Sequence, residues 1–194
     1  DERNSFKMPS SLRLGNFIGT KFENFDDIEE YEGSSMAAHS DHLFDPSLTF
    51  DTIGWIKEIS GLPILVKGIL RPDDAQKAMS SGADGIIISN HGGRQLDTAV
   101  PTLKQIEPIR NQVGKEATLI VDGGIRRGTD ILKCIALGAD AVQVGRPLLW
   151  GLNYDGQKGV ELVLDLLNNE FIETMILTGC KDVSEISRDL VVKK

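Results

Sequence analysis

Hydrophobic and polar positions follow two alternating patterns along residues 51–194. Short β-branched apolar runs, which predict strands, are separated by stretches with helical spacing of their apolar positions. The predicted strands are Ile64–Lys67, Ile86–Ser89, Leu119–Asp122 and Ala141–Gly145. The predicted helices cover residues 72–81, 102–113, 129–137 and 158–177. Because the strands are continuously apolar, we expect them to be buried on both faces, as in a parallel sheet covered by helices.

The strand–helix–strand pattern occurs twice. The segment PILVKGILRPDDAQKAMSSGADGIIIS begins at Pro63, and TLIVDGGIRRGTDILKCIALGADAVQVG, which begins at Thr118, matches it with one extra glycine. In this alignment Gly82 matches Gly138, and both stand where a helix C-terminal glycine belongs. Two βαβ units in tandem supply four parallel strands, half of a (β/α)8 barrel. A small open α/β sheet is the alternative architecture.

Residues 1–50 follow neither pattern. They are irregular, polar and acidic, so we expect them to be separate from a half-barrel that covers residues 51–194. Within them an aromatic or aliphatic residue recurs at every third position, at Phe22, Phe25, Ile28 and Tyr31. This spacing predicts an amphipathic helix over residues 22–32 that docks by its aromatic stripe.

The composition narrows the classes of partner. The 194 residues carry a net charge of −8, from 29 acidic and 21 basic side chains, which argues against nucleic acid and anionic membranes. No apolar stretch approaches the ~20 residues that a membrane span requires. Cys134 and Cys180 form no CxxC pair and no cluster of metal ligands. We therefore expect a reduced, intracellular protein without a metal site.

From its two ends, we expect the given sequence to carry neither a signal peptide nor an SKL-type ending. The N-terminal DERNSFKMPSS has no signal-peptide hydrophobic region and no initiator Met, so we expect a fragment or a cut chain. The C-terminal LVVKK is not an SKL-type peroxisomal ending. Both a cytoplasmic and a peroxisomal location stay open.

Ionisable side chains gather at the carboxyl ends of the predicted strands, where parallel α/β folds place their functional residues. In chain order these ends carry Lys67, then Ser89, His91 and Arg94, then Asp122 and Arg126, and finally Arg146. Buried charges of this kind are costly unless they meet a ligand or one another. The sequence therefore predicts a functional site along this rim.

Two glycine-containing segments at the last two strand ends predict a phosphate site. In DGGIRRG, Gly123 and Gly124 directly follow a strand, so their backbone can approach an anion closely. Thr129 is expected to open a helix whose N–H groups face that anion. VGRP adds Gly145 and Arg146, and in barrels the loops after strands seven and eight commonly hold phosphate. The alternative is a pair of ordinary turns with surface arginines.

His91 and Arg94 suit a different task. Arginine binds a carboxylate bidentately, and histidine acts as a general base near neutral pH. An acid held by Arg94 would present its α-carbon to His91. Lys67 follows the apolar PILV, where it would stabilise negative charge on a cofactor ring; a surface lysine is the alternative.

Four motifs, LPILVKG, GIIISNHGGRQLD, VDGGIRRGTD and GADAVQVGRP, resemble in order and spacing the FMN-dependent α-hydroxy-acid oxidases and dehydrogenases. This family includes glycolate oxidase, L-lactate oxidase and the flavin domain of flavocytochrome b2, and its fold is a (β/α)8 barrel. The likeness runs from about Asp1 to Ser187. It implies that the chain is the C-terminal half of the barrel, strands five to eight. Residues 1–50 would then belong to the active-site loop after strand four.

The resemblance also implies FMN as the cofactor and a role for each residue at the strand ends. His91 is the proton acceptor, Arg94 binds the substrate carboxylate, and Lys67 stabilises the reduced, anionic flavin ring. Ser89 is implied to contact the isoalloxazine ring. The implied contacts to the ribityl chain and phosphate are Asp122, Gly123, Gly124, Ile125, Arg126, Gly145 and Arg146.

The implied reaction is oxidation of a small (S)-2-hydroxy acid, of the glycolate or lactate type, to the 2-oxo acid, with O2 giving H2O2. The first half of the family barrel, which carries the aspartate that orients the histidine, is not in this sequence. We therefore expect the isolated chain to be inactive without an N-terminal half-barrel, and a homo-oligomer, tetrameric in the family, to be the working form. Two alternatives remain: another FMN- or phosphate-binding barrel enzyme, which the SNHGGRQ segment disfavours, and a non-catalytic truncated half-barrel.

Overall fold

The computed structural model describes residue 15, residues 18–20 and residues 45–192. The chain divides into two units, Asp1–Thr49 and Phe50–Lys194, and every helix and strand described below belongs to the second. The amphipathic helix predicted over residues 22–32 lies outside the described residues.

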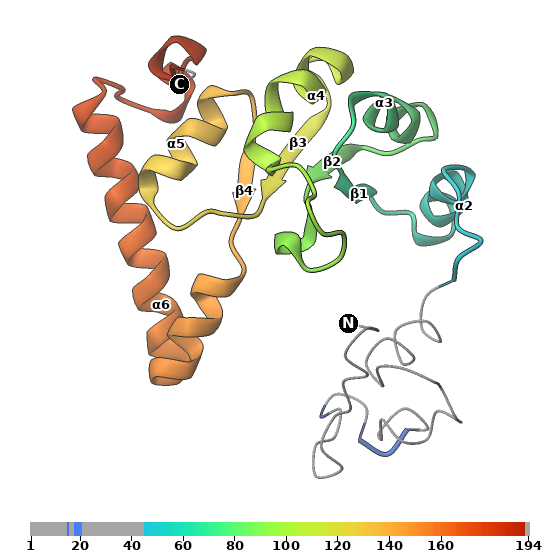
Figure 1. Cartoon of the computed structure of the whole chain (residues 1–194), viewed down its shortest axis with the longest axis horizontal. Helices are drawn as coiled ribbons and strands as arrows, with labels where there is room; N and C mark the ends of the chain where they lie inside the picture. The colour runs from blue at the N-terminus through green and yellow to red at the C-terminus, as the bar shows by residue number, and fades with distance from the viewer. Residues whose placement is uncertain (1–14, 16–17, 21–44, 193–194) are drawn as a thin grey trace. The chain divides into compact units, whose positions relative to one another are not determined.

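The second unit alternates helices and strands (Figure 1). It begins with α2 (Asp51–Ser60), β1 (Leu65–Ile69), α3 (Pro72–Ser80) and β2 (Gly85–Ile88). Two 3₁₀ turns, η4 (His91–Gly93) and η5 (Thr102–Gln105), lead to α4 (Ile106–Val113) and β3 (Thr118–Asp122). The remaining elements are α5 (Gly128–Ala136), β4 (Ala141–Gln143), α6 (Arg146–Leu177), η6 (Val183–Glu185) and η7 (Arg188–Leu190).

The four strands form one parallel sheet in the order β1-β2-β3-β4. Leu65 lies opposite Gly85, Gly85 lies opposite Thr118, and Ile120 lies opposite Ala141. A helix joins each strand to the next, which is the connection that parallel neighbours require. The parallel α/β architecture predicted from the hydrophobic pattern is confirmed.

The two faces of this sheet differ in how well they are covered. Ala75 and Ala78 of α3, together with Ile106 and Ile109 of α4, pack with strand residues such as Leu119 in the main core. On the opposite face, residues of β1 and β4 are exposed, and only β2 is buried along its whole length. Burial of both faces was predicted for all four strands and holds for β2 alone. Strand β3, although central in the sheet, is also only partly buried on the second face, where Thr118 is exposed.

The predicted strands lie within two residues of the observed ones, and the helix predicted over residues 158–177 matches the second segment of α6. The first segment, which begins at Arg146, was not predicted. Asp155 (φ −151°) and Gly156 (φ 52°) break α6, and its two segments lie side by side in Figure 1. Glycines allow this packing, because a Cβ added to Gly159 would lie 1.8 Å from the carbonyl oxygen of Gly151. Helix α2 was not predicted.

A glycine follows the helix of each repeat, as predicted. Gly82 (φ 102°) follows α3 and Gly138 (φ 107°) follows α5, both in the left-handed half of backbone space that residues with a Cβ rarely adopt. The residue after each glycine donates its N–H back into the helix, from Ala83 to Ala78 at 3.1 Å and from Ala139 at 3.0 Å. This is the Schellman pattern, which supplies partners for the last carbonyls of a helix.

The aspartate that ends each GAD segment makes equivalent contacts in the two repeats. The carboxylates of Asp84 and Asp140 each accept a backbone N–H at the start of the preceding strand, both at 2.7 Å. Each also binds a cation from the helix that precedes that strand, Lys57 of α2 at 2.7 Å and Arg110 of α4 at 2.7 Å. The hydrogen bond from Lys57 lowers the pKa of the Asp84 carboxyl. These contacts link the helix, the strand and the turn at the amino-terminal end of the strands, opposite the end that carries the predicted site.

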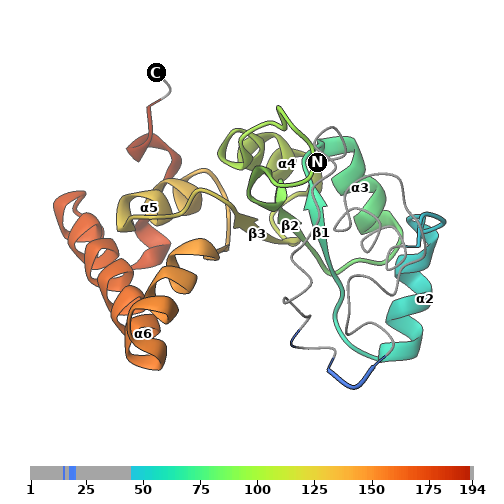
Figure 2. The ribbon, with the colours of Figure 1, turned by 60° about the horizontal axis from the view of Figure 1, so that its bottom comes forward.

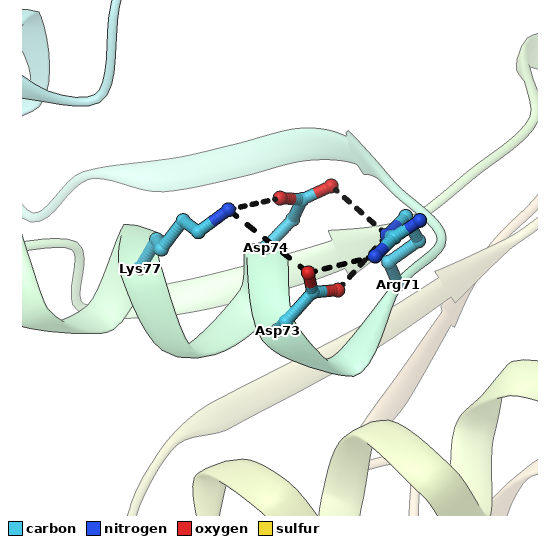
Figure 3. A network of polar contacts seen from close by, with 4 residues as sticks. All are labelled: Arg71, Asp73, Asp74 and Lys77. Atoms are coloured by element: carbon cyan, nitrogen blue, oxygen red, sulfur yellow. Dashed lines mark hydrogen bonds and ion pairs between the residues drawn. The ribbon is translucent and has the colours of Figure 1, made fainter.

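Charged residues that follow β1 form a separate surface network (Figure 3). Arg71 donates two hydrogen bonds to Asp73, at 2.9 and 2.8 Å, and Lys77 lies 3.2 Å from Asp74. The hydrogen bond from Arg71 lowers the pKa of Asp73 to about 2. The carboxylates sit in the first turn of α3, where negative charge is favoured by the helix dipole. Arg71 therefore stabilises the start of α3.

Candidate active site

A cavity of about 440 Å³ opens where the carboxyl ends of β1, β3 and β4 meet the turn after β2. It is lined by all but one of the residues predicted from the strand ends: Lys67, His91, Arg94, Asp122, Gly123, Gly124, Ile125, Arg126, Gly145 and Arg146. The exception is Ser89, which is only 2% exposed and lies behind Lys67 and Asp122. The structure thus brings residues that are up to 79 positions apart, Lys67 and Arg146, to one cavity.

The cavity is rich in positive charge although the chain as a whole is acidic. Among the described residues that line it, four have basic side chains: Lys67, Arg94, Arg126 and Arg146. The one carboxylate in this lining, Asp122, lies 2.9 Å from the Lys67 ammonium and is neutralised by it. The three arginines are left to attract negatively charged groups of a ligand.

Three side chains from neighbouring strand ends form a polar cluster beneath the cavity. The Nζ of Lys67 donates to the Oγ of Ser89 at 2.9 Å, and the Ser89 hydroxyl donates to the Oδ2 of Asp122 at 3.0 Å. Lys67 is paired in register with Ile87, which in turn lies opposite Ile120. Since side chains alternate between faces, Lys67, Ser89 and Asp122 point to the same side of the sheet. The cluster joins β1, β2 and β3.

The turn after β2 has an unusual backbone. His91 (φ 56°), Gly92 (φ 67°) and Gly93 (φ 74°) are three successive residues in left-handed conformation. For a residue with a Cβ this conformation costs about 1–2 kcal/mol, which explains the two glycines of SNHGGR. His91 is the member of the three that carries a side chain, and its N–H donates to the Oγ of Ser89 at 3.0 Å.

Arg146 links this turn to the end of β4. Its Nη2 donates to the carbonyl oxygen of Gly92 at 3.2 Å. A Cβ at Gly92 would lie 3.1 Å from the same Nη2 atom, so a side chain there would press on the arginine. The turn that carries His91 and Arg94 therefore lies against the segment predicted to bind phosphate.

The start of α6, and not that of α5, faces the cavity. The amides of Arg126 and Arg127 donate to Asp130, and the amide of Gly128, the first residue of α5, donates to Glu170. These three amides already have protein partners, and an anion at the helix start near Thr129 stays a prediction.

Helix α6 offers its first turn instead. Arg146, Pro147, Leu148 and Leu149 all line the cavity, and no side chain of the described residues caps the helix at Gly145. An uncapped helix N-terminus attracts anions. The sequence did contain a signal for this helix start, because proline is favoured in the first turn and Pro147 follows Gly145 closely.

Long helix α6 is held in place by contacts with α5, and the two helices lie side by side in Figures 1 and 2. Gly128 allows the close approach, since a Cβ there would lie 2.1 Å from the backbone N of Phe171. Arg127 and Glu170 form an ion pair at 3.0 Å across the same contact. These contacts hold the second segment of α6 against the start of α5.

The described residues contain neither a cluster of metal ligands nor a helix that could span a membrane. No group of three or more His, Cys, Asp and Glu side chains in that part of the chain is arranged to hold a metal ion. Among the same residues, no helix has the length and apolar character needed to cross a membrane.

Comparison with known proteins gives a consistent set of matches. The FMN-dependent dehydrogenase family matches residues 1–193. The 2-hydroxyacid oxidase 1 of Mus musculus is 46% identical over 193 residues, covering 100% of this chain and 52% of the relative. An L-lactate oxidase of Nostoc sp. is 44% identical over 187 residues, covering 96% of this chain and 50% of the relative.

Solved structures agree with these matches. Mandelate oxidase with (S)-4-hydroxymandelic acid is 40% identical and superposes with a TM-score of 0.79, covering 96% of this chain and 51% of that chain. The chain spans about half the length of the curated relatives it matches.

Proposed function

The chain belongs to the FMN-dependent dehydrogenase family, and from this membership we propose that it forms strands five to eight of a (β/α)8 barrel. Four parallel strands in sequential order, one uncovered sheet face and two edge strands support this proposal. Exposed apolar side chains on and after α2, including Trp55, Ile59 and Leu62, offer surface for the remaining half. The loop segment 1–50 would follow strand four.

The residues around the cavity fit FMN. Gly124 and Gly145 have open space where a Cβ would stand, so their backbone is accessible to a phosphate. Arg126 and Arg146, with Gly123 and the first turn of α6, would bind that dianionic group. Asp122 and Ile125 would lie along the ribityl chain, and Lys67 would face the ring. When bound, FMN would take two electrons from the substrate and pass them to an acceptor, with O2 proposed here.

His91 and Arg94 are proposed to handle the substrate. Arg94 would hold the carboxylate of a small (S)-2-hydroxy acid, and His91 would accept one of the two protons lost as the alcohol carbon becomes a carbonyl. The observation that carries this proposal is the shared cavity: His91, Arg94 and the first turn of α6 line one space. The names of the relatives, 2-hydroxyacid oxidase and L-lactate oxidase, point to the same substrate class.

The alternatives make different predictions. Another phosphate-binding barrel enzyme would not need His91 and Arg94 beside the phosphate end, and a non-catalytic half-barrel would not bind flavin with its partner half. A tetrameric assembly, an intracellular location in the cytoplasm or peroxisome, and inactivity of the isolated chain are further parts of this proposal. The peroxisomal option has support from relatives such as the Arabidopsis thaliana peroxisomal (S)-2-hydroxyacid oxidase GLO3, which is 44% identical over 179 residues.

The test uses the full-length protein, reconstituted with FMN and screened against glycolate, lactate and mandelate with detection of peroxide. Turnover of at least one acid is expected. His91→Ala should retain flavin absorbance and lose turnover by about 100-fold or more, since a general base contributes about 10²–10⁴ in rate. Undiminished turnover in His91→Ala, or a wild-type protein that binds FMN and oxidises no 2-hydroxy acid, contradicts the proposal.

A further inference from the structure

We infer that Ser89 is a positioning residue that anchors His91 in its left-handed backbone conformation and holds Lys67 against Asp122. The inference rests on the proposed function, in which His91 is the base and Lys67 faces the cofactor. The family resemblance implies a contact between Ser89 and the flavin ring. The geometry points to a different use of its hydroxyl.

The hydrogen-bonding capacity of Ser89 is fully used within the described residues. A serine hydroxyl has one donor and two acceptor lone pairs. The Ser89 hydroxyl donates to Asp122 at 3.0 Å and accepts from the Lys67 ammonium at 2.9 Å and from the His91 N–H at 3.0 Å. With the residue only 2% exposed, no hydrogen bond remains for a flavin atom.

The bond to the His91 amide explains the spacing Ser-x-His-Gly-Gly. Of the three left-handed residues after Asn90, two are glycines, for which this conformation carries no penalty. His91 has a Cβ and needs a compensating contact, and the Ser89 hydroxyl two residues earlier supplies it in the manner of an ST-turn. Without that acceptor, His91 would relax toward the right-handed region and carry its imidazole away from the cavity.

The same hydroxyl also fixes the direction of Lys67. Two of the three N–H groups of the ammonium are directed at Ser89 and Asp122. The third is then directed by elimination into the cavity, which Lys67 lines. Loss of the hydroxyl would leave the ammonium with one anchor, and its long side chain would sample other rotamers. One buried hydroxyl thereby orients both groups proposed to act on substrate and cofactor.

The test compares Ser89→Ala and Ser89→Thr in the full-length, FMN-loaded protein, with hydrogen–deuterium exchange read by mass spectrometry. In Ser89→Ala, amides of the His91–Arg94 turn should exchange about tenfold faster or more, while the strands keep their protection. The kcat should fall about 10- to 100-fold with flavin still bound, because misplacement by an ångström costs up to about 100-fold. Ser89→Thr, which keeps the hydroxyl, should restore both readouts.

A matched control removes a hydroxyl away from the cavity. Thr174 in α6 donates to the Glu170 carbonyl at 2.6 Å and is part-buried, and Thr174→Val should change neither the exchange of the turn nor kcat. Unchanged exchange at His91 in Ser89→Ala overturns the inference. So does loss of FMN without a change in exchange, which would make Ser89 a cofactor contact.

Two further arms cover other outcomes. If Ser89→Ala does not fold, Ser89→Cys replaces it in the test. Because sulfur is a weaker hydrogen-bond acceptor than oxygen, the His91 amide should exchange faster in Ser89→Cys than in Ser89→Thr. Equal exchange rates in these two variants overturn the inference. If the wild-type protein oxidises no 2-hydroxy acid, the proposed function fails. The exchange measurement on His91 still decides the role of Ser89 in that case.

Discussion

The variant Arg110→Met tests the contacts between Arg110 and Asp140, the more extensive of the two equivalent cation–aspartate contacts in the two repeats. The guanidinium donates to the carbonyls of Gly138, Gly114 and Ala117 and to the carboxylate of Asp140, each at 2.7 Å. Methionine keeps the apolar stem but leaves these acceptors without their donor. The contacts to Gly138 and Ala117 are part-buried, and an unsatisfied acceptor of this kind costs about 1–2 kcal/mol. The exposed acceptors regain hydrogen bonds to water in the variant, so they add little to the loss of stability.

The free energy of unfolding should therefore fall by about 2–4 kcal/mol. Lys57→Met provides the matched control, because Lys57 makes the equivalent contacts, to Gly82 at 3.0 Å and to Asp84 at 2.7 Å. Its side chain is 43% exposed, against 13% for Arg110, so its loss should cost about 1 kcal/mol or less.

The assay is urea unfolding of the full-length protein, followed by tryptophan fluorescence, with the midpoint compared at constant m. The unfolding midpoint of Arg110→Lys should lie between those of the wild type and Arg110→Met, because lysine keeps the positive charge but lacks the planar set of donors of a guanidinium. Equal losses for Arg110→Met and Lys57→Met would refute the argument from burial. A loss below about 1 kcal/mol for Arg110→Met would show that the carbonyls find other partners.

Two other predictions concern the packing of α5. Gly128→Ala should destabilise the protein by about 1–3 kcal/mol, because its Cβ would lie 2.1 Å from the Phe171 N and 2.2 Å from the Glu170 carbonyl carbon, and main-chain atoms cannot move aside. Gly54→Ala is the control: its Cβ meets nothing closer than 3.6 Å, so an unfolding midpoint that falls equally in both variants would contradict the contact. Burial raises the pKa of the Cys134 thiol to about 12, so native protein at pH 8 should resist iodoacetamide at this site until it is unfolded. The folded thiol keeps its proton above the ordinary pKa of 9.0, so its contribution to stability is constant below that pH and declines above it; rapid native labelling would refute the burial.

Local patterns in the chain were sufficient for much of the fold. β-branched runs marked all four strands within two residues, and Gly82 and Gly138 marked helix ends, because both signals depend on neighbours in sequence. Helix α2 was missed. The first segment of α6 was missed as well; Asp155 and Gly156 separate it from the second segment, and its apolar residues, such as Leu149 and Trp150, are largely exposed.

The residues of the candidate site were predictable in position because parallel strands place their carboxyl ends at one edge. Their contacts were not. Glu170 accepts from the Gly128 amide at the start of α5 from 42 residues along the chain, and only the packing of the two helices brings these residues together. The position of the start of α6 at the cavity is likewise a result of the tertiary fold.

The sequence by itself determined which residues have the chemistry for an acid and a phosphate, and on which strand ends they stand, because the two repeats set the period of strands and turns. Tertiary structure decided how these residues are used. The buried hydroxyl of Ser89 takes its three partners from β1, β3 and the His91 turn, and the helix start that lines the cavity is that of α6, where no side chain of the described residues caps the helix. Whether a polar group has all its hydrogen-bond partners depends on the residues that surround it in the folded protein, and a pattern along the chain does not show these residues directly.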